Sequence, residues 1–342
     1  MRIIFYLGLI LLLGSSCQQK PDVTTLVFGS CSQQESDTQL WEEINAEHPQ
    51  VWIWGGDNIY GDSPILDTLQ RKYATQKNRP AYQQLLNNTI ITGTWDDHDY
   101  GVNDGGKLFT AKKITQQAFL DFMNVSKDDP RRNQEGVYSA LEIGAGDRKV
   151  KIINLDTRYH RDTLIREYYI DSVSQRKKYN AIPNTEGDVL GEAQWSWLEK
   201  ELTNSTADVT IINSSIQVLS EEHPFEKWAN FPVARERLFD LIIKSKAKGV
   251  LLISGDRHIA EFSKINLEGL PYPLYDFTSS GLTHTYADGG TEINKHRVGN
   301  VITQLNYGLI KINWEDTRAA VTLRIKGKDG VTYQQQSITF SY

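Results

Sequence analysis

Short apolar runs alternate with longer amphipathic segments through the first two thirds of the chain. Short runs bounded by turn residues are typical of buried strands, whereas apolar residues that recur every three or four positions are typical of helices. The predicted strands are residues 26–28, 51–54, 90–95, 150–155, 209–213 and 250–254. The predicted helices are residues 37–48, 65–86, 111–123, 191–202 and 232–248. This alternation predicts an α/β fold in which helices pack against a sheet.

The C-terminal part of the chain, from residue 272 onward, has a different pattern. Short alternating strands follow one another there without helices between them, which suggests a second sheet. These strands are residues 274–278, 308–313, 319–325 and 336–342. Residues 159–190 are polar and aromatic without clear periodicity, and a segment of that length is either a functional lid or a solvated insertion. No linker divides the chain, so we expect one domain over residues 24–342.

The N-terminus has the features of a targeting segment. A charged start, Met1 and Arg2, precedes apolar residues 3–13 and a few small residues. This run is too short to span a bilayer permanently, so residues 1–16 are predicted to be a signal peptide. The cysteine directly after it, Cys17, is typical of a bacterial lipoprotein, with residues 17–23 as the tether. The alternative is an ordinary cleavage site. We expect an extracytoplasmic protein, anchored to a membrane through lipid on Cys17.

Composition narrows the choice of function. The net charge of -6 and the scattered basic residues leave no polycationic face, which argues against nucleic acid as a partner. The 8 Trp and 16 Tyr residues fit a well-filled core and also carbohydrate binding. If Cys17 carries lipid, Cys31 has no partner for a disulfide, so its thiol is either buried as a small apolar group or bound to a metal. We expect a monomer.

Four segments with metal-binding side chains lie at the ends of predicted strands, where loops begin. In α/β folds, active sites and ligand sites are usually found at such strand ends. Carboxylates that converge on one point bind hard cations, and thiolate, phenolate and imidazole add further ligands. Taken singly, each of these metal-binding residues could equally be a turn, packing or loop residue. Their joint occurrence at four strand ends favours a metal-dependent hydrolase. The candidate metal ligands are Cys31, Asp57, Tyr60, Asp97, Asp256 and His258.

These motifs resemble the alkaline phosphatase D (PhoD-like) family of the calcineurin-like metallophosphoesterase superfamily. The resemblance spans most of the chain. The wider superfamily has Asp-x-His as its first motif, where this sequence has Cys31, and histidine where this sequence has Asp256. The resemblance implies a four-layer αββα sandwich of two mixed β-sheets flanked by helices, and a centre that joins Fe³⁺ to Ca²⁺. The segments that carry it are residues 29–31, 56–60, 95–99, 155–158, 191–202 and 255–258.

Counting charge favours the same pair of ions. Five anionic ligands, Cys31, Asp57, Tyr60, Asp97 and Asp256, sum to -5, whereas two divalent ions supply +4 and Fe³⁺ with Ca²⁺ supplies +5. Ferric iron also lowers the pKa of thiols and phenols enough to keep them deprotonated. We expect Cys31, Asp57, Tyr60 and His258 around iron and the other two aspartates toward calcium.

The resemblance also implies catalytic roles. His98 holds the position of the superfamily's catalytic histidine, where it would protonate the departing alkoxide, and Asp99 beside it would orient the ring. The alternative for His98 is a surface residue in an acidic loop. Arg158 would bind the phosphate through its guanidinium group, and Arg257 is a weaker candidate for that role. The expected substrate is a small-molecule or lipid phosphoester.

The remaining histidines are expected to be surface residues, with His160 and His284 the two exceptions because their loops border the site. These are His48, His160, His223, His284 and His296. The chain has no dinucleotide-binding or phosphate-loop glycine motif. A competing hypothesis is a non-catalytic surface lipoprotein that binds glycan or metal, suggested by the aromatic residues and the anchor.

Overall fold

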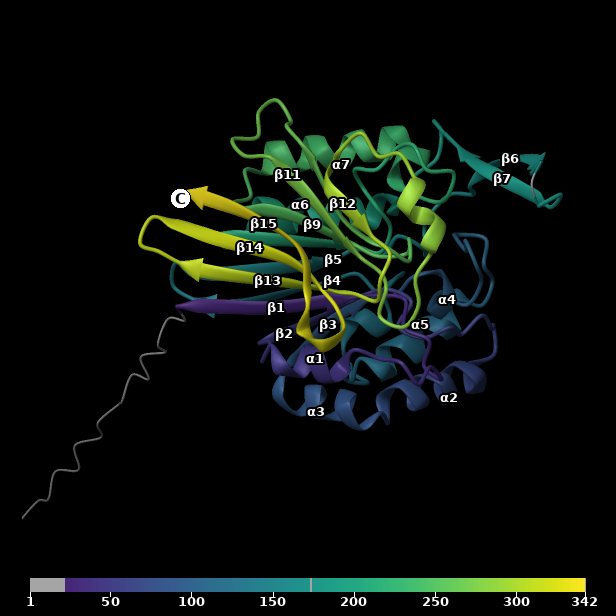
Figure 1. The fold of residues 1–342 in the computed structure, drawn as a ribbon, viewed down its shortest axis with the longest axis horizontal. Coiled ribbons are helices and arrows are strands. Elements are labelled where there is room, and N and C mark those ends of the chain that lie inside the picture. The colour runs from purple at the N-terminus through teal and green to yellow at the C-terminus, as the bar shows by residue number, and fades with distance from the viewer. Residues whose placement is uncertain (1–21, 173, 342) are drawn as a thin grey trace, which may run out of the picture.

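The computed structural model describes residues 22–172 and 174–341, which form two large sheets covered by helices (Figure 1). The predicted signal peptide and Cys17, the predicted site of lipid attachment, lie outside the described residues. Across the described part of the chain, no helix has the length and apolar character needed to cross a membrane.

The first sheet contains β1 (Val23–Gly29), β2 (Val51–Gly55), β3 (Ile90–Thr94), β13 (Tyr307–Trp314), β14 (Arg318–Lys326) and β15 (Thr332–Ser341). Its strand order is β15-β14-β13-β1-β2-β3. The first three strands along the chain are parallel, and the three C-terminal strands join them antiparallel through the pairing of β1 with β13.

The second sheet contains β4 (Ser139–Ala145), β5 (Arg148–Asn154), β8 (Val209–Ser214), β9 (Val250–Ser254), β10 (Ala260–Ile265), β11 (Leu274–Ser279) and β12 (Arg297–Ile302). Its strand order is β12-β10-β11-β9-β8-β5-β4. Strands β5, β8, β9 and β11 are parallel, and the others are antiparallel to their neighbours. Both sheets are therefore mixed, as the resemblance implied.

Helices cover the outer face of each sheet (Figure 1). The helices α1 (Trp41–Ala46), α2 (Leu66–Lys77), α3 (Pro80–Asn88) and α5 (Lys112–Phe122) lie on the first sheet, and α6 (Gly191–Thr203) and α7 (Pro232–Ser245) lie on the second. A short helix, α4 (Asp97–Tyr100), follows β3 directly. The four-layer αββα sandwich is confirmed.

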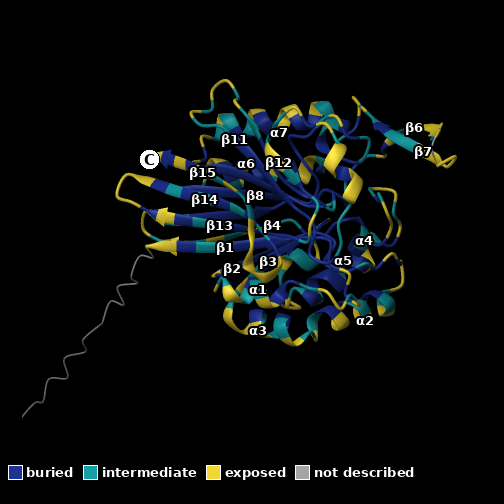
Figure 2. Cartoon of the chain, in the orientation of Figure 1, coloured by how far each residue is buried: buried dark blue, intermediate teal, exposed yellow. Residues whose placement is uncertain are grey.

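Alternation along the central strands builds these layers, because successive side chains of a strand point to opposite faces. Leu26 and Phe28 enter the core between the two sheets, whereas Val27 enters the core beneath the helices. On β2, Trp52 and Trp54 also enter the core beneath the helices. The strands are consequently buried on both faces (Figure 2), which explains their continuous apolar runs.

The C-terminal strands were expected to form a second sheet together, and this expectation is wrong because they are divided between the two sheets. Strands β13, β14 and β15 extend the first sheet, whereas β11 enters the second, beside β9, and so does β12, which was not predicted. The period of a strand reveals which residues face the core but not which strand lies next to it. The predicted helix over residues 65–86 is also divided in two, since Pro80 starts α3 and ends the hydrogen bonding of α2.

The segment of residues 159–190 contains a hairpin, β6 (Ile165–Ile170) and β7 (Lys177–Ile182), that pairs with neither large sheet. The hairpin projects beyond the second sheet, at the upper right of Figure 1. Most residues of β6 are exposed, and Tyr179 of β7 reaches the pocket described below.

Candidate metal centre

The C-terminal ends of parallel strands from both sheets meet at one place. Cys31 follows β1, Asp57 follows β2, Asp97 follows β3, and Asp256 and His258 follow β9. Positive φ angles occur at four of these residues, 61° at Cys31, 50° at Asp57, 67° at Asp256 and 55° at His258. Such angles are uncommon for residues other than glycine and gather at functional sites.

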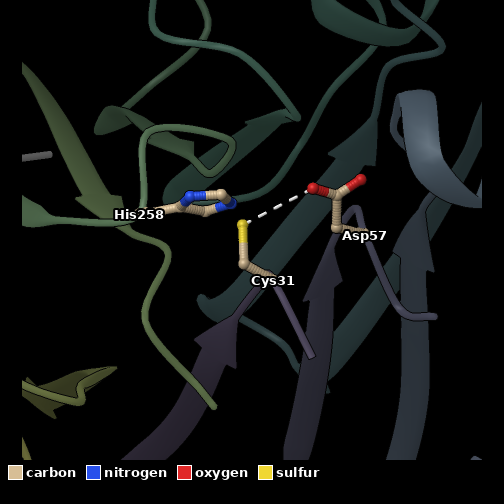
Figure 3. A group of neighbouring side chains, drawn as sticks. All are labelled: Cys31, Asp57 and His258. Atoms are coloured by element: carbon tan, nitrogen blue, oxygen red, sulfur yellow. Dashed lines mark hydrogen bonds between the residues drawn. The ribbon is translucent and has the colours of Figure 1, made fainter. Parts of the chain in front are cut away.

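The ligand atoms form three overlapping groups, in each of which the atoms lie within 4.8 Å of one another. The first joins Cys31, Asp57 and His258, and Figure 3 shows these side chains pointing toward one another, with the thiol 3.6 Å from a carboxylate oxygen of Asp57. The other groups are Asp57, Asp97 and His98, and Asp96, Asp97 and Asp256. Asp57 and Asp97 each belong to two groups, so the structure offers adjoining cation sites with shared ligands.

Tyr60 completes the first group. Its hydroxyl oxygen lies 3.0 Å from Nε2 of His258 and 3.0 Å from Nε2 of His284. The ring of Tyr60 also lies against the ring of His98, with centroids 4.2 Å apart. His284, expected as an exception among the remaining histidines, is therefore a neighbour of the predicted ligands.

The donors fit multivalent cations. Burial, followed by the charge of Asp57, raises the pKa of the Cys31 thiol well above its usual range, and burial raises the pKa of Tyr60 in the same way. Burial and the neighbouring carboxylates raise the pKa of Asp57. One oxygen of Asp97 is buried without a hydrogen-bond partner among the described residues. Cations would offset these charges and occupy the open lone pairs.

His98 is oriented by a different acid from the one expected. Its Nδ1 lies 2.7 Å from an oxygen of Asp62, whereas Asp99 accepts hydrogen bonds from the amide of Asp96, at 2.6 Å, and from the side chain of Asn58, at 2.6 Å. Burial alone would lower the pKa of His98, but the hydrogen bond with Asp62 and the charge of Asp97 outweigh it and raise the pKa to about 9.

A family model described as PhoD-like phosphatase matches residues 26–319 of the chain. The chain belongs to this family. The resemblance drawn from the motifs at the strand ends is thereby confirmed.

Known proteins similar to the chain agree with this assignment. Alkaline phosphatase D of Bacillus subtilis (strain 168) is 22% identical over 194 residues, which cover 51% of this chain and 32% of that protein. The match thus spans about a third of the relative's length. A solved structure titled "Structure of PhoD" superimposes with a TM-score of 0.75 at 17% identity and covers 94% of this chain and 70% of that one.

A second solved structure shares the fold at a greater distance. It is titled "GAP50 the anchor in the inner membrane complex of Plasmodium", and it has a TM-score of 0.56 at 11% identity, with 94% of this chain and 90% of that one covered. At these identities, both structural matches establish the fold alone.

In this PhoD-like chain, Arg158 does not have the predicted role. Its side chain is 0% exposed, and the guanidinium group is held by Asp96 on one side and by Glu226, at 2.5 Å, on the other. Glu226 also pairs with Arg161 at 2.7 Å. A guanidinium group enclosed by two acids is not free to bind phosphate, so Arg158 is a positioning residue for the acidic cluster. Arg257 instead lines the pocket.

The structure of this family member reveals site residues that the sequence argument missed. Asp96 joins the acidic cluster, Asp62 orients His98, and Glu226 lines the pocket. Only Asp96 carried a signal, since it adjoins Asp97 in the sequence. His223 corrects a further expectation, because it is buried and its pKa is lowered by that burial.

Gly56, beside Asp57, explains how the segments approach so closely. Its φ is 96°, and a Cβ atom there would lie 2.5 Å from the Cβ of Asp96. Glycine is required here both for the backbone angle and for the space.

Proposed function

We propose that the chain is a metal-dependent phosphoric ester hydrolase that uses Fe³⁺ and Ca²⁺. The observation that carries this proposal is the set of overlapping ligand groups at the strand ends, which opens into a pocket of about 250 Å³ that His98 also lines. Family membership supports the same activity.

The donor chemistry suggests how two cations would be divided. Cys31, Tyr60 and His258 offer the softer and more polarisable donors that suit iron, with Asp57 beside them. Asp96, Asp97 and Asp256 offer only carboxylate oxygens, which suit calcium. When bound, the cations would supply Lewis acidity to the phosphoryl group and to water.

The chain's own residues supply the proton. Because Nδ1 of His98 is engaged by Asp62, Nε2 is the nitrogen that can donate to the departing alkoxide. In the metal-free chain, the hydrogen bond with Asp62 and the charge of Asp97 raise the pKa of His98 to about 9, which favours the protonated imidazole that a general acid requires. The hydrogen bond from the amide of His98 to Asp57, at 3.2 Å, ties the acid to the ligand cluster.

The ion assignment is tested by colour and by metal analysis. A ferric phenolate absorbs visible light, so the purified protein should be coloured and Tyr60→Phe should remove the band. Phe retains the ring that packs against His98, which makes the variant a test of the hydroxyl alone. A colourless, active protein that contains only zinc would overturn the iron assignment.

The role of His98 is tested with esters whose leaving groups differ. His98→Ala should keep the metals but lose about 10²–10⁴-fold in turnover on alkyl esters, and far less on esters of acidic phenols, which leave without a proton. Equal losses on both kinds of ester would remove His98 from the role of general acid.

We further propose that the hydrolase acts outside the cytoplasm as a lipoprotein. The support is the N-terminal sequence alone, in which Cys17 follows a short apolar run and small residues. Labelled fatty acid should be incorporated into the wild type and not into Cys17→Ser. Incorporation into both would refute the anchor.

A further inference from the structure

The pocket over the metal centre has a wall made of three aromatic side chains. Tyr179 belongs to β7, Phe225 lies in the loop after β8, and Tyr286 precedes the short helix η3 (Ala287–Thr291). All three are partly exposed. The rest of the lining is carboxylate, imidazole, amide and guanidinium groups, so these rings are the one apolar surface that a bound molecule meets in this pocket.

Hydrogen bonds link the segments that carry two of these rings to candidate ligands. The amide of Tyr286 donates to the carbonyl oxygen of His258 at 2.8 Å. The hydroxyl of Tyr179 donates to the carboxylate of Asp104 at 2.6 Å, and the amide of Asp104 donates to the carboxylate of Asp97 at 2.6 Å. These hydrogen bonds hold the two segments beside the metal centre.

The third ring, Phe225, packs against two other residues that line the pocket. The ring of Phe225 meets that of Tyr286 edge to face, with centroids 5.9 Å apart, and the guanidinium group of Arg257 lies 4.2 Å from its centroid. Two hydrogen bonds to Glu292, of 2.6 and 2.8 Å, hold Arg257 in that place. The guanidinium group lies over the Phe225 ring and, as a flat cation, itself offers a surface on which a π system can stack.

We propose that Tyr179, Phe225 and Tyr286 bind the alcohol portion of the ester, and that they select phosphoesters in which a planar aryl or heteroaryl ring lies close to the phosphate. The inference rests on the proposed hydrolase function, since it places the phosphate at the acidic cluster. Ring faces and a guanidinium plane attract a flat π system more strongly than an aliphatic group of equal size.

The size of the pocket limits the substrate further. Its volume of about 250 Å³ lies just below the range of about 300–1,000 Å³ that is usual for ligand pockets. The space inside the pocket therefore suits a phosphate with one ring. The three aromatic residues belong to three separate segments, so the preference for a planar ring depends on how these segments pack around the pocket.

The test compares benzyl phosphate with cyclohexylmethyl phosphate on the metal-replete full chain. Both are esters of primary alcohols with similar reactivity and apolar size, and they differ in the planarity of the ring. We expect kcat/KM to be about tenfold higher for the benzyl ester, which corresponds to about 1.4 kcal/mol of stacking. Benzylphosphonate should bind more tightly than cyclohexylmethylphosphonate by a similar factor, as measured by calorimetry.

Variants assign the preference to the wall. Phe225→Leu keeps an apolar side chain but removes the ring face, so the ratio between the two esters should fall to about twofold or less. Tyr169→Leu is the matched control, because Tyr169 is 41% exposed on the same hairpin and does not line the pocket. It should retain the full preference. Thermal unfolding checks that both variants fold.

The outcomes separate this inference from the function on which it rests. If the wild type hydrolyses both esters at equal rates and binds both phosphonates equally, the planar-ring inference is overturned and the hydrolase stands. If the metal-replete protein hydrolyses neither these esters nor methyl phosphate, the proposed hydrolase is overturned, and the inference falls with it. A preference that survives Phe225→Leu would also refute the role of the wall.

Discussion

Replacing Arg158 with methionine should destabilise the fold more than it weakens substrate binding. Methionine fills a similar volume without charge, so the change removes the cation and leaves Asp96 and Glu226 in place. All three side chains are at most 1% exposed. The acids lose their counter-charge and cannot regain water.

The structure sets the size of the effect. Removing one partner of a buried ion pair costs about 3–5 kcal/mol, because the remaining charge stays desolvated. Glu226 keeps its pairing with Arg161 at 2.7 Å, whereas Asp96 keeps no cation and only neutral donors among the described residues, the hydroxyl of Ser215 at 2.8 Å and the backbone amide of Asp99. Most of the loss therefore falls on Asp96, and we expect a loss of about 3–5 kcal/mol in the free energy of unfolding at pH 7.

The loss should depend on pH. Burial raises the pKa of Asp96 above its usual value of 3.8, and Arg158 opposes that rise. Without the arginine the pKa rises further, so the folded variant takes up a proton as the pH falls. A carboxyl group whose folded pKa is raised favours the fold at low pH and loses that contribution as the pH rises. The difference in free energy of unfolding between the wild type and the variant should therefore become smaller as the pH falls from 8 to about 5.

Urea unfolding of the metal-free wild type and variants, followed by circular dichroism, measures these differences. Arg237→Met is the control, since Arg237 makes an equally close pair with Glu192, at 2.6 and 3.0 Å, but the two side chains are 45% and 77% exposed. Exposed pairs contribute about 0–1 kcal/mol. Equal losses in the two variants would refute the burial argument. Wild-type stability with a raised KM would show that Arg158 contacts the substrate after all.

Three further changes test the site. Asp62→Asn should return the pKa of His98 from about 9 toward 6.5 in an NMR titration of the metal-free protein. Because a raised histidine pKa stabilises the fold at low pH and this contribution is lost as the pH rises through the folded value, the variant should be less stable than the wild type at about pH 6 and equally stable at about pH 10. Gly56→Ala should cost about 1–3 kcal/mol and weaken metal binding, because of the clash with Asp96. Gly330→Ala, at a φ of 70° with open space around it, should cost less, and equal costs would argue against the clash. Adding Ca²⁺ to chelated protein should raise the free energy of unfolding by about 2.7 kcal/mol at a hundredfold excess over Kd, and an unchanged Tm would argue against a cation in the acidic cluster.

The central strands could be predicted because they are buried on both faces. The continuous apolar runs at residues 51–54 and 250–254 carry that signal, and the structure has strands there. Strands β4 and β10 escaped prediction for the opposite reason. β4 alternates between half-buried and exposed residues, and β10 carries Glu261 and Ser263, both buried through polar contacts. Burial of polar side chains depends on partners that lie elsewhere in the chain.

The same distinction separates the ligands from the residues that position them. Cys31, Asp57 and Asp256 each follow a strand, so local sequence placed them together before the structure did. The pairing of Asp62 with His98 spans 36 residues, and that of Arg158 with Glu226 spans 68. Neither pairing has a local signature, since each arises where loops from different strands converge. Sequence motifs therefore predicted which donors gather, and only the fold shows what orients them.

The direction of β1 has a consequence for where substrates come from. The strand starts at Val23 on one side of the molecule and leads to Cys31, and its seven residues span about 20 Å. Figure 1 shows its start and the hairpin β6–β7, which borders the pocket, on opposite sides. If the domain is anchored through Cys17, as the N-terminal sequence predicts, the anchor is attached on the side of the molecule opposite the hairpin that borders the pocket. The pocket would open toward the surrounding fluid, so dissolved esters would reach it more readily than headgroups of the membrane that holds the domain.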